Sequence, residues 1–247
     1  MDYLNDLADD RLLNGCVYCF GGLEETRDHV PSRILLDSPF PTNLPVVPAC
    51  HKCNAGFSLD EEYVAALLAC VLTGSTEPSK IQHERVARSL ERNPALRARL
   101  ESSKREENGR IIFAVEEDRV RNVICKLAKG HAAYELSTPY RAAPDQIACR
   151  PIPEMTNDEW DNFDAAHVDG VINEIGSRNS QRLLVTQFLL EAGKGEPLSM
   201  NLLVNDWVEV QNGRYRYQAI DGPEIVRIKM VLAEYLACEV IWNRDNC

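Results

Sequence analysis

Four of the nine cysteines form two pairs with the spacing of a zinc site. Two residues separate Cys16 from Cys19, and two separate Cys50 from Cys53. Each such pair folds into a tight knuckle that presents both sulfurs to one ion, and two knuckles complete a tetrahedral site. Because four thiolates leave no open coordination position, we predict a structural Zn²⁺ that stabilises a small folded unit.

Three polar side chains near these pairs could carry out phosphodiester chemistry. Asp28 and His29 lie between the two pairs, and Asn54 directly follows Cys53. Carboxylate and amide oxygens suit Mg²⁺ or Mn²⁺, and a histidine with a near-neutral pKa can take a proton from water. If residues 26–31 are extended, Asp28 and His29 point to opposite faces of the strand, so that one can face a metal and the other the attacking water.

The order of these features resembles the HNH endonuclease superfamily, most closely its zinc-bearing branch typified by phage recombination endonuclease VII. In that branch a Cys-x-x-Cys precedes Asp-His, and a second Cys-x-x-Cys is followed directly by Asn. The resemblance implies a treble-clef-like ββα-metal finger in which His29 is the general base and Asp28 and Asn54 hold a catalytic Mg²⁺ or Mn²⁺. It covers residues 14–65, and it departs from many relatives at Phe57, where they have lysine; no second histidine follows on the helix.

Hydrophobic patterning predicts an α+β protein in three segments. These are the nuclease module over 1–72, a helical segment with a basic stripe over 73–136, and a β-rich C-terminal α+β region of unassigned role over 137–247. The predicted helices cover 3–13, 54–72, 79–92, 94–107, 117–136, 157–176 and 178–192. The predicted strands cover 26–31, 44–47 and 111–115, a hairpin over 207–217 around Asn212-Gly213, and further strands within 225–242.

The charge distribution indicates where a polyanion could bind. The net charge of −11 argues against a nucleic-acid binder held by charge alone. Residues 80–130, however, carry 13 basic and 8 acidic side chains, and arginines recur there at helical spacing. The resemblance implies DNA as the substrate, with RNA as the alternative, and we expect substrate contacts from the basic residues Arg33, Lys52, Arg85, Arg88 and Arg92, with Arg99 continuing the stripe.

The rest of the chain predicts a cytoplasmic protein with no membrane partner. Its first ten residues are acidic, unlike a secretory signal, and the five other cysteines are scattered, which is typical of free thiols. The acidic C-terminal region suggests a regulatory partner or ligand, as in a defence or mobile-element nuclease, and the family resemblance raises a homodimer as a further hypothesis.

Two other interpretations compete with the nuclease. The first is a non-catalytic zinc module that binds nucleic acid or protein, in which His29 only caps a turn. The second is a cysteine-based redox or zinc sensor. Loss of cleavage on changing His29→Ala separates the nuclease from the first alternative, and tightly held zinc argues against the second.

Overall fold

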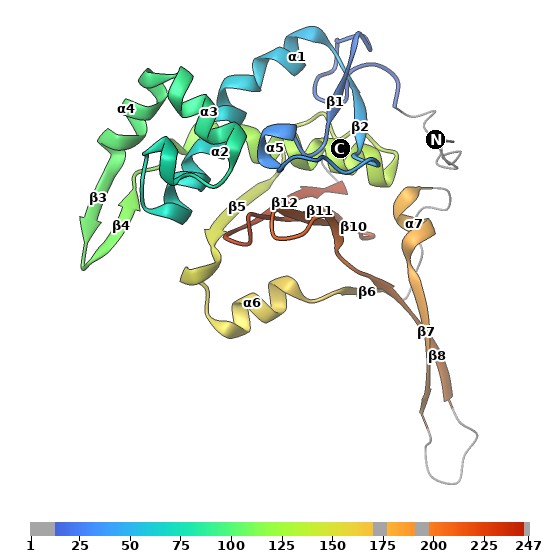
Figure 1. The fold of residues 1–247 in the computed structure, drawn as a ribbon. Helices are drawn as coiled ribbons and strands as arrows, with labels where there is room; N and C mark the ends of the chain where they lie inside the picture. The colour runs from blue at the N-terminus through green and yellow to red at the C-terminus, as the bar shows by residue number, and fades with distance from the viewer. Residues whose placement is uncertain (1–12, 170–176, 191–197, 245–247) are drawn as a thin grey trace.

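The computed structural model describes residues 13–169, 177–190 and 198–244, and in these residues the chain is a mixed α+β fold, as predicted (Figure 1). The helix predicted over 3–13 lies outside the described residues. No helix in the described residues is long and apolar enough to cross a membrane.

The N-terminal part is a two-stranded hairpin followed by two consecutive helices. Their bounds are β1 (Thr26–His29), β2 (Val46–Ala49), α1 (His51–Gly56) and α2 (Ser58–Thr73). The second strand lies two residues later than predicted, because antiparallel pairing places Asp28 opposite Val47 and Thr26 opposite Ala49. The helix begins at His51 rather than residue 54, because the Cys50 sulfur accepts the Cys53 N–H and caps it.

The middle segment contains two capped helices and a small hairpin. Their bounds are α3 (Glu84–Arg92), α4 (Pro94–Ser103), β3 (Lys104–Glu107) and β4 (Arg110–Phe113). Asn93 caps α4, as its place before Pro94 predicts. The helix predicted over 94–107 is wrong in its last four residues, which form β3. Asn108 and Gly109 take positive φ and reverse the chain, so that β3 pairs with β4.

The long helix α5 (Glu117–Leu136) has the bounds that the sequence predicts and lies between the N-terminal hairpin and the C-terminal sheet (Figure 1). A stripe of Lys126, Gly130 and Ala133 faces the hairpin. Gly130 lies so close to Val30 that a Cβ there would be 2.5 Å from a Val30 methyl group, and Ala133 packs in the cluster of buried residues around the cysteines. Spacings of four and three residues place this stripe on one face of the helix.

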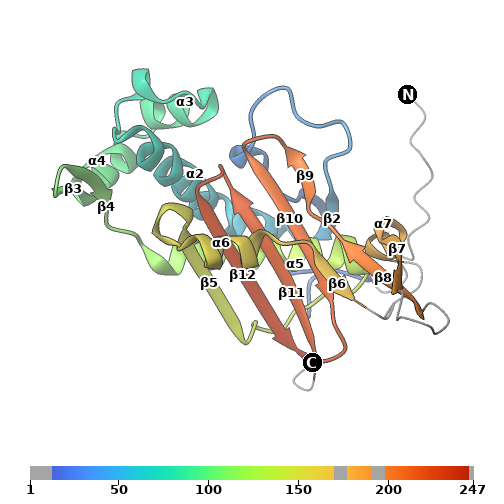
Figure 2. The ribbon, with the colours of Figure 1, turned by 90° about the horizontal axis from the view of Figure 1, so that it is seen from below.

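The C-terminal region is built on a five-stranded antiparallel sheet of order β5-β12-β11-β10-β9 (Figure 2). The strand bounds are β5 (Gln146–Pro151), β9 (Val208–Gln211), β10 (Tyr215–Asp221), β11 (Ile225–Leu232) and β12 (Leu236–Asn243). Helix α6 (Asn157–Asp164) covers the face opposite α5, where its Phe163 carbonyl accepts a hydrogen bond from Lys229 Nζ at 2.7 Å. The predicted Asn212-Gly213 hairpin is confirmed between β9 and β10.

The helices predicted over 157–176 and 178–192 are each confirmed only in part in the described residues. Helix α6 ends at Asp164, β6 (His167–Asp169) follows, and α7 covers only Arg178–Arg182. Residues 184–190 form β7, which pairs with β8 (Leu198–Asn205) in a ribbon that projects from the body (Figure 1). Pairing with the next strand, β8, overrides the weak helical pattern of this segment.

One hydrophobic core runs through all three predicted segments. It joins residues of α2, α3, α4 and α5 to the inner faces of β10, β11 and β12, with Trp242, Tyr63 and Tyr215 among its largest buried side chains. A second cluster surrounds the cysteine pairs and contains Val17, Val30, Val47 and Ala133. Because α5 contributes to both clusters, it fixes the hairpin relative to the rest of the molecule.

Candidate metal centre and active site

The two cysteine pairs converge on one point, as their spacing predicts. The sulfurs of the four cysteines all lie within 4.8 Å of one another. Those of Cys19 and Cys50 are 4.0 Å apart. Zinc–sulfur bonds of about 2.3 Å in a tetrahedron require sulfurs about 3.8 Å apart. The four residues therefore fit a structural Zn²⁺.

The backbone around the cysteines is shaped to keep this space open. The Tyr18 N–H donates to the Cys16 sulfur and the Cys53 N–H to the Cys50 sulfur, each at 3.4 Å. Gly22 lies directly against the cluster, and a Cβ on it would be 2.8 Å from the Cys50 sulfur. Only glycine therefore fits at position 22.

Asp28 and His29 point to opposite faces of β1, as predicted for an extended segment. Asp28 is buried; its Oδ2 accepts a hydrogen bond from the Tyr18 hydroxyl and forms an ion pair with the Lys126 ammonium, both at 2.8 Å. Lys126 Nζ also contacts Glu61 Oε1 at 2.5 Å and Ser32 Oγ at 2.8 Å. The Lys126 ammonium is therefore the cation between two carboxylates, Asp28 and Glu61.

His29 lies on the outer face of β1 and is partly exposed. Its Nε2 is 2.8 Å from Nη2 of Arg33. A guanidinium only donates, so Nε2 must accept, and the neutral ring carries its proton on Nδ1. Burial, and after it the positive charge of Arg33, lowers the pKa of His29 from its ordinary value. The geometry and the pKa both favour a neutral imidazole at pH 7.

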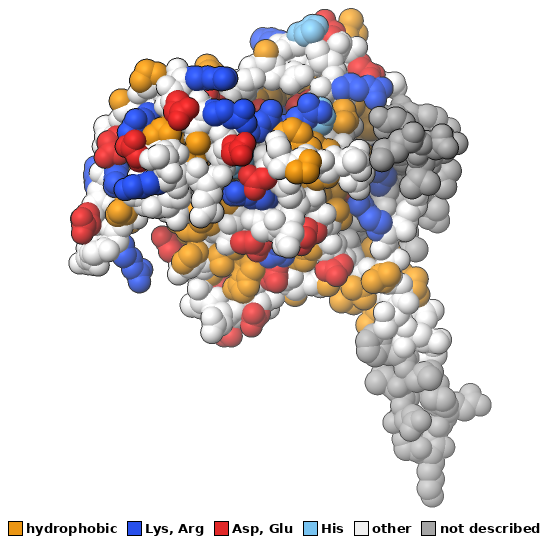
Figure 3. Space-filling model, viewed as in Figure 1, with side chains coloured by type: hydrophobic (Ala, Val, Ile, Leu, Met, Phe, Trp, Pro, Cys, Tyr) orange, Lys and Arg blue, Asp and Glu red, His pale blue; other side chains and the backbone are white. Residues whose placement is uncertain are grey.

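Two arginines that are distant in sequence meet at the Phe40 ring, and one of them, Arg33, contacts His29. Arg85 Nη1, on α3, is 3.3 Å from the Arg33 carbonyl oxygen. The guanidinium carbons of Arg33 and Arg85 lie 5.4 and 4.8 Å from the centre of the Phe40 ring. Among the described residues neither guanidinium has a carboxylate within 4.0 Å, whereas Arg97 and Arg150 have acidic partners. Basic side chains gather on this face between α3 and the hairpin (Figure 3).

Asn54 packs against the inner face of β1, the face that carries Asp28. Its Nδ2 donates to the Thr26 hydroxyl at 3.0 Å, and Thr26 lies two residues before Asp28 in the strand. Asp28 and Asn54 therefore border the same side of β1. The remaining oxygen of each side chain, Oδ1, is a hard donor of the kind that divalent cations prefer in general.

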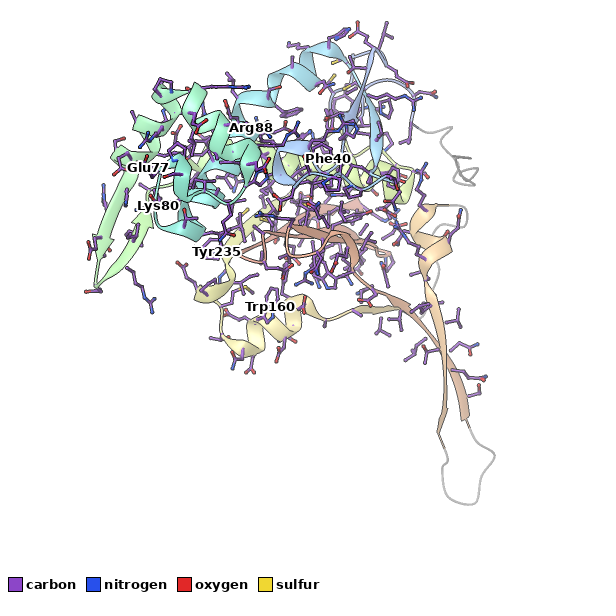
Figure 4. All side chains as sticks on the ribbon, in the orientation of Figure 1. Phe40, Glu77, Lys80, Arg88, Trp160 and Tyr235 are labelled. Atoms are coloured by element: carbon purple, nitrogen blue, oxygen red, sulfur yellow. The ribbon has the colours of Figure 1, made fainter. Side chains whose placement is uncertain are left out.

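The other predicted basic residues lie apart from His29. Lys52 is exposed on α1, and Arg92 is exposed in the last turn of α3. Arg88 pairs with Glu84 in its own helix at 3.5 Å, and in Figure 4 it is seen on α3, to one side of Phe40. Arg99 is 3.6 Å from Glu116. The basic stripe therefore contributes only Arg85 to the site.

The residues that surround Asp28 were not predicted from the sequence. Lys126 lies three residues after the inward-facing Val123, so helical periodicity could have placed it near the buried side of α5. No sequence pattern indicated a role for Tyr18 or Thr26. Both lie close to the motif, Tyr18 inside the first cysteine pair and Thr26 at the start of β1. Phe40 lies in the proline-rich loop, and only the tertiary fold brings it under Arg33 and Arg85.

Comparison of the chain with protein-family models, with curated proteins and with solved structures finds no match. The functional interpretation therefore depends on the arrangement of the side chains described above.

Proposed function

We propose that this protein is an HNH-type endonuclease whose N-terminal ββα-metal finger hydrolyses phosphodiester bonds in DNA, with RNA as the alternative substrate. The observation that carries the proposal is the contact between His29 Nε2 and Arg33, next to the Arg85 guanidinium, which has no carboxylate within 4.0 Å among the described residues. A base and an anion-binding group side by side are what phosphodiester hydrolysis requires. The adjacent four-sulfur cluster and the Asp28–Asn54 pair support the same assignment.

Arg33 and His29 act in sequence when substrate binds. Before binding, Arg33 donates to the lone pair on Nε2 with which His29 would accept a proton. A phosphodiester oxygen is a stronger acceptor for a guanidinium than an imidazole nitrogen is, because the hydrogen bond joins two full charges. Substrate therefore draws Arg33 away and exposes Nε2, which takes a proton from the attacking water. Arg85 binds the same phosphate or the next one along the strand.

Asp28 and Asn54 supply the hard oxygens that would hold a divalent cation, Mg²⁺ or Mn²⁺. When bound, such a cation neutralises charge on the phosphate and on the leaving oxygen. Lys126 and Tyr18 orient the Asp28 carboxylate by occupying Oδ2, which leaves Oδ1 directed elsewhere. The four cysteines hold the structural zinc that keeps β1, β2 and α1 together.

The test is cleavage of supercoiled plasmid, single-stranded DNA and RNA by the zinc-loaded protein with Mg²⁺, Mn²⁺ or chelator. We expect His29→Ala to lower the rate by about 10²–10⁴-fold, the contribution typical of a general base. Arg33→Ala is expected to weaken both substrate binding and turnover. Arg88→Ala is the matched control, since Arg88 is exposed and paired within α3, and it should cleave like the unmodified protein.

Two outcomes would contradict the nuclease. Absence of metal-dependent cleavage on all three substrates favours a non-catalytic zinc module. Cleavage that survives in His29→Ala at the unmodified rate points to a contaminating nuclease or to a different base. DNA binding without cleavage, measured with labelled duplex, identifies the binding module directly.

A further inference from the structure

Thr26 makes two hydrogen bonds that together determine which way the Asn54 amide faces. Its hydroxyl donates to the Ala49 carbonyl oxygen at 3.0 Å, directly across the β1–β2 ladder. The same hydroxyl oxygen is 3.0 Å from the Asn54 side-chain nitrogen. Thr26 is not part of the motif that the family resemblance rests on.

The single proton of the Thr26 hydroxyl determines which end of the Asn54 side-chain amide faces it. A threonine hydroxyl has one proton, and a carbonyl oxygen can only accept, so the proton of Thr26 is used at Ala49. Towards Asn54, the hydroxyl oxygen can therefore only accept, and the group that faces it must be the NH₂ of the amide. The amide oxygen of Asn54 then points away from Thr26. The assignment follows from hydrogen-bond chemistry, which distinguishes the two ends of an amide that are alike in shape.

The same contacts connect this orientation to the zinc cluster. Ala49 directly precedes Cys50, and the Asn54 N–H donates to the Cys50 carbonyl oxygen at 3.0 Å. Ala49, which accepts the Thr26 proton, and Cys50, which accepts the Asn54 N–H, are therefore consecutive residues. A zinc ion that fixes Cys50 would fix both ends of the Thr26–Asn54 contact.

We propose that Thr26 is a positioning residue that presents the carbonyl oxygen of Asn54 to a divalent cation. This inference rests on the proposed function, in which Asn54 and Asp28 hold Mg²⁺ or Mn²⁺. Thr26 does not touch the cation; it acts by holding the NH₂ end of the amide. Without its hydroxyl the amide turns freely between two states, of which only one offers an oxygen.

The test is Mn²⁺ binding to the zinc-loaded protein, followed by calorimetry and by electron paramagnetic resonance, with no substrate present. Thr26→Val keeps the β-branched shape and removes the hydroxyl, and Thr26→Ser keeps the hydroxyl. Loss of a group that orients a metal ligand weakens metal affinity by about 10–100-fold. We expect that loss in Thr26→Val and near-unmodified affinity in Thr26→Ser, with zinc content unchanged in both.

An Asn54→Asp background separates positioning from a general structural role. Both terminal atoms of aspartate are oxygens, so its orientation does not matter to the cation. Thr26→Val should therefore leave Mn²⁺ affinity unchanged when Asn54 is replaced by aspartate. An equal loss in both backgrounds would mean that Thr26 only supports the strand, and would overturn the inference.

The remaining outcomes distinguish this inference from the proposed function. If Asn54→Ala weakens Mn²⁺ binding and Thr26→Val does not, the inference is wrong and the metal site stands. If Asn54→Ala binds Mn²⁺ like the unmodified protein, the metal site is wrong, and the inference falls with it. Should Thr26→Val fail to fold, hydrogen exchange of the Asn54 side-chain NH₂ in the unmodified protein decides: slow exchange supports the Thr26 contact, and exchange at the rate of a free amide refutes it.

Discussion

Replacing Lys126 by methionine should destabilise the whole molecule, because Lys126 is the buried cation between two carboxylates. Its side chain is 1% exposed, and those of Asp28 and Glu61 are 10% and 13% exposed. Lys126→Met keeps most of the volume of the stem and removes the ammonium. Two carboxylates would then lie side by side in a poorly hydrated site, with no opposite charge to compensate them.

The expected cost is about 3–5 kcal/mol, the range for breaking a buried ion pair by removing one partner. A domain is stable by only about 5–15 kcal/mol, so this is a large fraction of the total. The measurement is chemical denaturation of the zinc-loaded protein, followed by tryptophan fluorescence. Lys80→Met is the control, since Lys80 is exposed, and it should change the free energy of unfolding by less than about 0.5 kcal/mol.

Neutralising the partners tests the cause of the loss. If uncompensated charge is responsible, adding Asp28→Asn and Glu61→Gln to Lys126→Met should restore roughly half of the lost stability or more, because neutral amides cost less to bury. A cost below about 1 kcal/mol for Lys126→Met, the value of a solvated surface pair, would refute the reasoning. So would a triple variant less stable than the single one.

Three further predictions concern packing and pH. Gly22→Ala should abolish stoichiometric zinc binding in a chelator titration, because its methyl group would overlap two ligand sulfurs. Gly21→Ala is the control: its Cβ would meet nothing within 4 Å, so this variant should bind zinc normally. Gly130→Ala should cost about 1–3 kcal/mol in denaturation by pressing on Val30, and Val30→Ala should relieve most of it; an unchanged midpoint would contradict that contact. Burial lowers the pKa of His131 well below its ordinary value. Below pH 6.5 the imidazole of His131 therefore takes up a proton only in the unfolded chain, and the free energy of unfolding falls by up to about 1.4 kcal/mol for each pH unit of acidification. His131→Gln should show a shallower fall between pH 6.5 and 5.5, and equal slopes would mean that His131 is not the group responsible.

Local patterns predicted the elements that depend on local chemistry. The two Cys-x-x-Cys knuckles, the Asn93 cap before Pro94, and the Asn212-Gly213 hairpin each depend on residues adjacent in sequence. Strand alternation likewise placed Asp28 and His29 on opposite faces of β1. Where strand pairing competes with a weak local preference for helix, the prediction was wrong: residues 104–107 pair with 110–113 across the Asn108-Gly109 turn, and residues 184–190 pair with β8, although both segments were predicted as helix.

Only part of the candidate site could be predicted from the sequence. The motif named Asp28, His29 and Asn54, and the composition of the middle segment pointed to its arginines, but no spacing distinguishes Arg85 from Arg88. Their roles differ because α3 packs so that Arg85 reaches the Arg33 carbonyl oxygen while Arg88 turns back to Glu84. A helix presents its residues around its whole circumference, and only its neighbours decide which of them face a site.

By itself, the sequence determined that four sulfurs could gather and that a histidine, a carboxylate and an amide would lie close to them, because those residues are held on short connected elements. The tertiary structure decided what surrounds them: the Lys126 ammonium on Asp28, the Arg33 guanidinium on His29, and the Thr26 hydroxyl on the Asn54 amide. Such contacts join side chains up to about a hundred residues apart, where the cost of closing the chain is met only by the packing of the complete fold.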